Sequence, residues 1–446
     1  MDITLEGQIK PKINVFKNKN FSLLFWGIFV SNVAHIVFSF AISLYILQLA
    51  EPAYGEDKSA MIQALYLALS GIILVLLVPF GGALADKLNK VKTMYITDYI
   101  RGISISIVGI LLIFDMTVLN KIILLFIMNF ILSVNAAFFS PASSSLLRFV
   151  VADEELQPAT SILQGSYNFQ SILGLILGGI LYSVIGIVGI FVLNGAGYIV
   201  SAITEMFIKY NHEDHASDEK ISMKIMLKDI NDGLKYLLKE KAIVALLFMA
   251  LALNFFTAPI FSNAMPFFVT YRFADEISYI FQSFMSPENW FSIISVAFSV
   301  GAIIMSVILS RAATKEKYNR QLKGWLIGLV APMGAISVAM ILYYENLLSI
   351  NPTLIILVSL MFVIGLGNVA FNVPVSLILQ RKVDRNMLGK VSSVSSVLSQ
   401  ALIPISSLVA GSIIMGVGVT YLYIFCIIGI VIITTLYVCS KASNDL

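Results

Sequence analysis

One histidine, His35, interrupts an otherwise charge-free apolar run at residues 21–50. The unperturbed pKa of histidine, about 6.5, suits a group that takes up and releases protons near physiological pH. Asn32 and Ser39 lie three residues before it and four residues after it, on the same face of a helix. His35 therefore either carries a proton or contacts a bound molecule, or it is a neutral histidine hydrogen-bonded by Asn32 or Ser39.

A second chemical feature is the pair Asp98 and Arg101, three residues apart in an otherwise apolar segment. This spacing places an acid and a base side by side on a helix. Charged residues inside a membrane helix are usually functional, but a static ion pair near the membrane surface is the alternative. Glu205 and Asp115 are weaker candidates than His35 for a proton-carrying side chain, because each lies near the end of its apolar segment.

The composition places these residues in a membrane. The chain has 446 residues, of which 58% are hydrophobic and 12% are charged, and its mean hydropathy is +0.90. Soluble domains carry about 25% charged residues, so this chain has too few to cover a water-exposed surface. It is expected to be an all-α integral membrane protein.

The gaps between charges predict twelve transmembrane helices. A helix needs about 20 residues to cross the bilayer, and two long runs break at Ser183–Gly189 and Gly416–Thr420, so each is expected to form two helices. The span at 93–114 contains Asp98 and Arg101. The other single spans are 21–50, 59–85, 122–147, 242–271, 289–310, 324–344 and 346–380, and the two long runs are 156–204 and 391–440.

The basic residues predict the orientation of these helices. With the N-terminus on the cytoplasmic side, 25 of the 29 lysines and arginines fall on that side, and the outer loops hold only Lys58, Lys121 and Arg272. This bias follows the positive-inside rule. Both termini are therefore expected to be cytoplasmic in a multi-pass protein of the plasma (inner) membrane.

The chain divides into two similar halves. The sequence NAAFFSP at 135–141 resembles NVAFNVP at 368–374, and the same shift places Arg148 on Arg381 and Gly178 on Gly411. Four matches in one register indicate internal duplication, and parallel six-helix repeats are a known transporter plan. The expected parts are a cytoplasmic segment 1–20, two pseudo-symmetric six-helix bundles at 21–208 and 242–440, a linker with an amphipathic helix at 209–241, and a tail at 441–446.

The segment GGALADKLNKVK, residues 81–92, resembles the loop between helices 2 and 3 of the major facilitator superfamily. TDYIRG at 97–102 and the segment 138–164 are similar to the branch that contains macrolide-type efflux proteins and the enterobactin exporter. In the loop motif Asn89 replaces the family's glycine. The resemblance extends over essentially the whole chain and implies a twelve-helix transporter fold.

The resemblance also implies a conformational latch in this loop. The small residues at 81–83 should let a neighbouring helix approach closely, and the lysines should hold the turn in the headgroup region. The second half lacks the corresponding acid in its own turn, 310–321. The latch residues expected from the motif and its adjoining charges are Gly82, Asp86, Lys87, Lys90, Asp98 and Arg101.

Helices 1, 4, 7 and 10 line the central cavity in this superfamily, so their polar residues are substrate-site candidates. Polar amides avoid lipid, but hydrogen bonds between helices, worth about 0.6 kcal/mol on average, are an equal alternative. His35 is also the candidate for proton coupling. The candidates for the cavity are Asn32, His35, Ser39, Asn135, Asn254, Asn263, Asn368, Asn372 and Phe256.

No nucleotide-binding motif, catalytic constellation or cofactor site is expected, and His212 and His215 fit a solvated linker better than a metal site. The expected function is export of small amphipathic or hydrophobic molecules by a monomeric secondary transporter, driven by protons and in contact with membrane lipids but not nucleic acid. The alternatives are a lipid or lysolipid transporter, a siderophore exporter, and a non-transporting receptor or scaffold.

Overall fold

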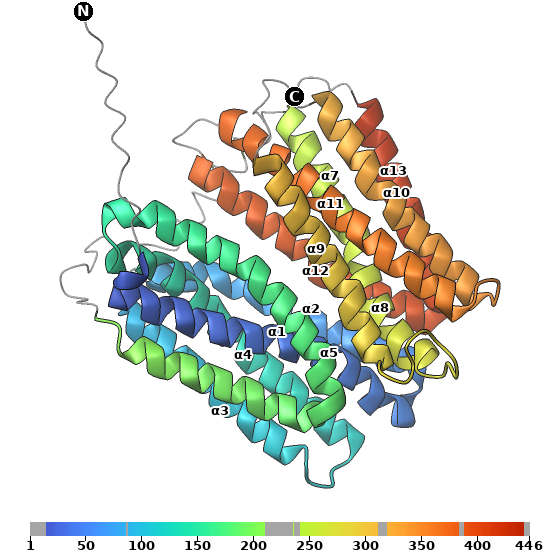
Figure 1. The fold of residues 1–446 in the computed structure, drawn as a ribbon, viewed down its shortest axis with the longest axis horizontal. Coiled ribbons are helices and arrows are strands. Elements are labelled where there is room, and N and C mark those ends of the chain that lie inside the picture. Colours follow the sequence, from blue (N-terminus) through green and yellow to red (C-terminus); the bar gives the residue numbers. More distant parts are fainter. Residues whose placement is uncertain are drawn as a thin grey trace, which may run out of the picture.

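The computed structural model describes residues 15–85, 88–209, 235, 241–310, 319–382 and 388–440, which form helices joined by short turns (Figure 1). No strand occurs among these residues. Asp86, Lys87 and almost all of the expected linker helix lie outside the described residues.

The first group of helices ends before the linker. It begins with a short 3-10 turn, η1 (Val15–Lys17), and Gly186, with φ 63°, turns its last helix back on itself inside the expected break. Glycine adopts this conformation without steric cost. The two arms of that helix, α5, are residues 153–185 and 187–206. The long helices of the group are α1 (Lys19–Tyr54), α2 (Glu56–Ala85), α3 (Lys90–Leu111), α4 (Val118–Val150) and α5 (Asp153–Met206).

The second group follows the linker. Its first span runs without interruption through α7 (Lys241–Pro259), the π-helical η3 (Ile260–Ala264), α8 (Met265–Phe267) and the π-helical η4 (Phe268–Phe273). Gly418, with φ 99°, separates the last two helices inside the second expected break. The remaining helices are α9 (Pro287–Ser310), α10 (Asn319–Tyr344), α11 (Ile350–Lys382), α12 (Leu388–Val417) and α13 (Val419–Cys439).

The described residues contain ten helices that are long and apolar enough to cross a membrane. One of the ten is the folded-back α5. In α12 the apolar stretch found is shorter, Leu402–Val417. The structure therefore establishes a helical, many-spanning membrane protein.

Hydrogen bonds identify which helix ends meet. The start of α1 bonds the end of α4 through Asn18 and Val150, and bonds the end of α5 through Asn20 and Lys209. We call this end of the molecule the basic end, because the described helix termini there carry Lys17, Lys19, Lys90, Lys92, Arg148, Lys209 and Lys323. The other end, which includes the turns at Gly186 and Gly418, is called the opposite end.

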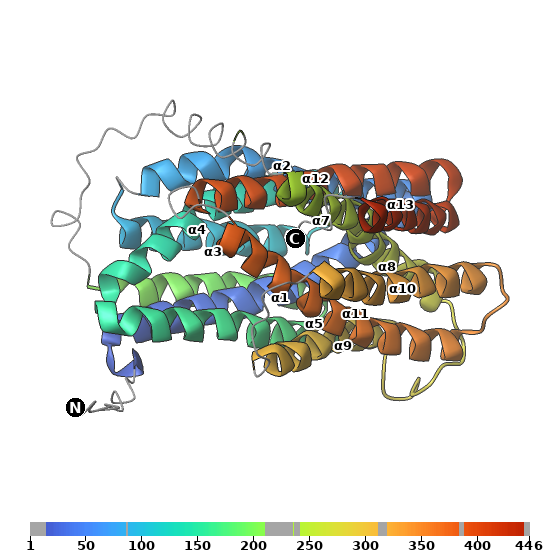
Figure 2. The same cartoon turned by 90° about the horizontal axis from the view of Figure 1, so that it is seen from above.

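The two groups of helices pack as two bundles (Figures 1 and 2). Two apolar clusters fill the N-terminal bundle, one near Phe21 and Met94 and one near Phe38 and Phe191, and a third fills the C-terminal bundle. Helices α4 and α11, which carry the repeated motif, are both 33 residues long.

Close helix packing in the C-terminal bundle depends on glycine. A Cβ at Gly301 of α9 would collide with the carbonyl oxygen of Phe362, and a Cβ at Gly365 of α11 would collide with that of Phe298. Small residues allow membrane helices to approach in this way. Gly81 has the same role on α2, against Ala137 of α4, as the sequence predicted.

Gly365→Ala is expected to lower the free energy of unfolding by about 1–3 kcal/mol, because the added methyl group meets backbone atoms that cannot rotate away. Denaturation of the detergent-solubilised protein measures the change. Gly328→Ala on α10 is the control, because nothing lies within 4 Å of its added Cβ. Equal stability of the two variants would contradict the packing argument.

Candidate functional site

The two bundles touch along two seams. In the α5–α9 seam, Gly179 packs on Ser292, whose hydroxyl donates to the carbonyl oxygen of Leu175. In the α2–α12 seam, Gly71 packs on Pro404 and Gly411 packs on Ala64. A glycine at each contact lets the two bundles approach closely.

A polar seal lies beyond these seams at the opposite end. The Tyr271 hydroxyl donates to the carbonyl oxygen of Leu47 at 2.8 Å, and Arg272 Nη2 lies 3.0 Å from Glu56 Oε2. Phe40 of α1 stacks on Phe291 of α9, with ring centroids 4.9 Å apart. These inter-bundle contacts lie at the middle of the helices or in the halves nearer the opposite end, and Figure 1 shows the bundles diverging towards the basic end.

Arg272→Glu is expected to weaken this seal by up to about 1 kcal/mol, because the pair is partly exposed and solvent screens it. Faster labelling of Ser39→Cys by an impermeant thiol reagent added at the opposite end measures the opening. The exchange Glu56→Arg with Arg272→Glu should restore the slow rate. Labelling that is unchanged by Arg272→Glu at low salt would contradict a role for the pair in closure.

A polar pocket of about 350 Å³ lies within the N-terminal bundle. Asn32, His35 and Ser39, which the sequence placed on one helical stripe of α1, all line it. His35 and Ser39 are exposed to the pocket, and the His35 Nε2 and Ser39 Oγ atoms are 3.5 Å apart. Asn32 instead donates to the Oε1 atom of Gln170 on α5. The polar and aromatic remainder of the wall includes Tyr66, Ser70, Arg101, Asn129, Ser133, Phe139, Ser140 and Tyr198.

Arg101 joins this pocket to a buried charge cluster. Its Nη1 atom lies 3.1 Å from Asp98 Oδ1, in the ion pair that the sequence left as the alternative to a functional role, and both side chains are buried by protein. The guanidinium also lies over the rings of Phe139, at 4.7 Å, and Tyr198, at 5.4 Å. Such cation–π contacts stabilise a desolvated cation.

Glu205 is buried in the same bundle, although the sequence placed it near the end of its apolar segment. It is fully buried, accepts a hydrogen bond from Ser201 at 3.3 Å, and is close enough to Asp98 and Arg101 for their charges to interact with it. The second arm of α5 brings it there, because Gly195 and Gly102 let this arm pack closely on α3. Small residues on both helices were the available sequence signal.

A second pocket, of about 230 Å³, lies where α2, η3 and α12 meet. Asn263 is buried there, and its Oδ1 atom accepts a hydrogen bond from Ser407 at 3.1 Å. The π-helical turn η3 holds Asn263, and such turns often mark functional sites. Both pockets share Leu67, Ser70 and Leu74 of α2, so they adjoin across the seam between the bundles.

The other sequence candidates lie outside these two pockets. Asn135 is buried and donates to the Ile131 carbonyl oxygen of its own helix, whereas Asn254 is exposed. Asn372 donates to Asn368 one turn earlier on α11. Phe256 packs on Gly429 and Phe425 of α13, because it occupies the face of α7 that points into its own bundle.

The latch candidates are only partly described. Gly82 lies in the last turn of α2, and Asn89 caps α3 by accepting a hydrogen bond from the Lys92 amide. Lys90 was expected among the lipid headgroups, but it is buried, with its ammonium group 5.0 Å from the Phe149 ring centroid. The adjacent end of α4 covers it, which the sequence of the loop could not indicate.

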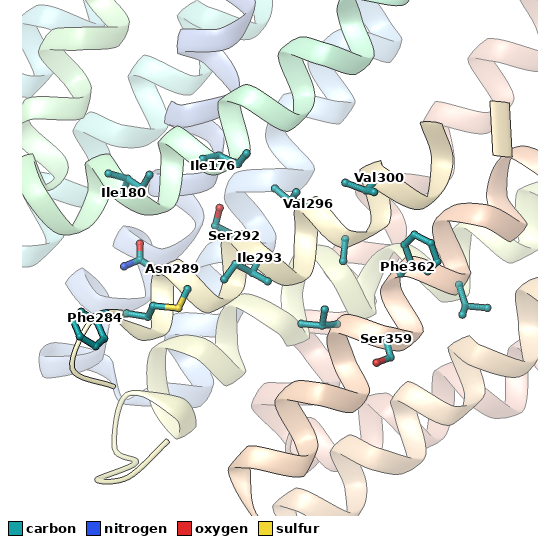
Figure 3. A pocket seen from close by; sticks show the side chains of 14 residues that line it. Ile176, Ile180, Phe284, Asn289, Ser292, Ile293, Val296, Val300, Ser359 and Phe362 are labelled. Atoms are coloured by element: carbon teal, nitrogen blue, oxygen red, sulfur yellow. The ribbon is translucent and has the colours of Figure 1, made fainter. Parts of the chain in front are cut away.

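A third cavity, an apolar groove of about 890 Å³, opens between α5, α9 and α11 (Figure 3). Ile176 and Ile180 form one wall, and Val296 of α9 and Phe362 of α11 lie across from them. The α9 residues that line the groove lie on the side of the helix roughly opposite to Phe291. Phe291 stacks on Phe40 of α1. The groove therefore opens outward from the bundles, and we call it the lateral groove.

Long apolar helices in two bundles, with polar pockets beside their common seam, define a multi-pass membrane transport protein. Residues 37–407 match the sequence profile of the Major Facilitator Superfamily, so the chain belongs to this family of transporters.

Similar proteins agree with this assignment. The uncharacterised MFS-type transporter YkuC of Bacillus subtilis (strain 168) is 26% identical over 243 residues, which cover 53% of this chain and 54% of YkuC. Macrolide efflux protein A of Streptococcus pyogenes is 24% identical over 250 residues, 55% of this chain and 58% of that protein. The chain thus spans little more than half the length of these two relatives. A bacterial homologue of the iron transporter ferroportin, in its inward-facing state, shares the fold, with a TM-score of 0.70, 15% identity, and coverage of 97% of this chain and 100% of that one.

Proposed function

We propose that this transporter exports small amphipathic or hydrophobic molecules by alternating access of its two bundles, with protons as the driving ion. The observation that carries the proposal is the position of the two pockets, which adjoin across a seam whose inter-bundle contacts lie from the middle of the helices towards the opposite end. A solute bound in these pockets would gain access to the other side of the membrane when the seams open and the basic end closes. The similarity to macrolide efflux protein A supports export.

In this proposal the basic end faces the cytoplasm, by the positive-inside rule. The conformation described is then open to the cytoplasm and sealed outside by Tyr271, Arg272 and Glu56. Both termini are cytoplasmic and the membrane is the plasma (inner) membrane. The proposal treats the two arms of α5 as separate spans and includes α12, which adds two spans to the ten candidates.

Transport in proteoliposomes tests the function. Wild type should move members of a panel of lipophilic dyes and antibiotics against their gradients when a pH gradient is imposed. His35→Ala should lose this transport, because His35 lines the pocket and faces Arg101. His215→Ala in the linker is the matched control and should behave as wild type. If transport is unaffected by the pH gradient and by His35→Ala, proton coupling is refuted and facilitated diffusion is favoured.

The lateral groove favours lipid handling as a second candidate function. It is lined mainly by apolar side chains, and Ile180 and Val363 on its walls are 49% and 40% exposed. A transporter of lysolipids would need such an outward opening towards the bilayer. Transfer of a fluorescent lysolipid between leaflets, lost in Val296→Trp although that variant still transports dyes, would support this candidate, and no transfer by wild type would refute it.

A further inference from the structure

The buried charges of the N-terminal bundle do not balance. Asp98 and Glu205 are both 0% exposed, and Arg101 is 6% exposed. Arg101 is the partner of Asp98, and it is also the cation that lies near Glu205. With both carboxylates ionised, the three side chains would carry a net negative charge inside the protein, which is costly without a further partner.

The contacts of the two acids show how this imbalance can be resolved. Asp98 Oδ1 has the Arg101 guanidinium at 3.1 Å, whereas the side chain of Glu205 accepts a hydrogen bond only from the Ser201 hydroxyl, at 3.3 Å, among the described residues. A buried carboxylate with one neutral donor and no cation in contact is costly. These contacts therefore favour one neutral acid and one carboxylate.

The remaining carboxyl oxygen atoms support the same conclusion. Asp98 Oδ2 and Glu205 Oε2 are buried and have no hydrogen-bond partner among the described residues. An unpartnered oxygen costs more on an ionised carboxylate than on a neutral acid. Arg101 likewise has Nε and Nη2 without partners in the described part of the chain, so it has donors available for a rearrangement.

The surroundings contain few other groups that can titrate. Tyr198 of α5 lies beside Arg101 and Asp98, and His35 of α1 faces Arg101 across the pocket. Next to Glu205, α1 presents Gly27. From α4, the Phe139 ring covers the guanidinium. Arg101 is thus the group that links the pocket to the two acids.

We propose that Asp98 and Glu205 share one proton and form the proton-binding site of this transporter. The part of the inference that concerns coupling rests on the proposed function. When Arg101 turns towards a solute in the pocket, Asp98 loses its counter-charge and the pair retains the proton. When Arg101 returns to Asp98, the pair releases the proton to water on the side to which the pocket is open.

Infrared spectroscopy of the purified full-length protein tests the shared proton without any transport. Wild type at neutral pH should show the carbonyl stretch of a buried protonated carboxyl group, which disappears as the pH is raised. Glu205→Gln and Asp98→Asn should each remove this band, because neither leaves two acids to share a proton. Asp115→Asn, at the exposed end after α3, is the matched control and should keep it.

A band that survives both substitutions, or no such band in wild type, would overturn the proposal. Should one variant fail to fold, which gel filtration would reveal, the other and Ser201→Ala decide the result, and Ser201→Ala should shift the band. In proteoliposomes, Glu205→Gln should lose the pH-gradient dependence that Asp115→Asn keeps. If wild type transports no probe, the proposed function fails, while the infrared result still decides the shared proton.

Discussion

Arg101→Met is expected to lower the free energy of unfolding by about 3–5 kcal/mol, because it removes the only guanidinium paired with Asp98 in the described structure. Asp98 and Glu205 would then remain buried together without this cation. Methionine keeps much of the arginine's apolar volume, so the loss would come from charge and not from a cavity. Equilibrium unfolding of the detergent-solubilised protein measures the effect.

Two further variants separate this explanation from general damage. Arg148→Met removes an exposed arginine at the end of α4 and should change stability by no more than about 0.5 kcal/mol. Arg101→Met combined with Asp98→Asn should recover much of the lost stability, because the uncompensated charge is gone. If Arg101→Met is as stable as Arg148→Met, the buried cluster does not depend on its cation.

Local features of this fold could be predicted from the sequence because neighbouring residues determine them. Asp98 and Arg101 are one helical turn apart, so their ion pair needs only a helix. Gly186 and Gly418 fall inside the predicted breaks because their conformations are strained for other residues. The long apolar runs likewise became membrane-length helices.

Features that depend on which helices meet could not be predicted in this way. Glu205 joins Asp98 only because the second arm of α5 packs on α3. Phe256 was expected at a cavity, but the rotation of α7 turns it towards α13. The sequence shows how far along an apolar helix a polar or aromatic residue lies. The direction in which its side chain points depends on tertiary packing.

Locking the α2–α12 seam is expected to abolish transport, because alternating access requires the bundles to part there. A Cβ at Gly411 would lie 2.5 Å from the Ala64 Cβ, so a slight separation gives the roughly 3.8 Å of a disulfide. Ala64→Cys with Gly411→Cys, in a chain with Cys426→Ser and Cys439→Ser, should therefore cross-link on oxidation. We call this protein the seam variant.

The control cross-link stays within one bundle. A Cβ at Gly197 of α5 would lie 2.8 Å from the Ala34 Cβ of α1. Ala34→Cys with Gly197→Cys, in the same cysteine-free background, therefore joins two helices that move together, and we call this protein the bundle variant. The oxidised bundle variant should keep its transport activity, except for any loss caused by local strain at the disulfide. It shows whether oxidation or a disulfide as such harms the protein.

Transport by the oxidised and the reduced seam variant in proteoliposomes is the most direct test of alternating access. We predict near-complete loss of transport on oxidation and recovery after a reducing agent, with the bundle variant unaffected. If the seam variant is shown to be cross-linked between positions 64 and 411 and still transports fully, the account is contradicted. The solute would then cross the membrane without separation of the two bundles at this seam.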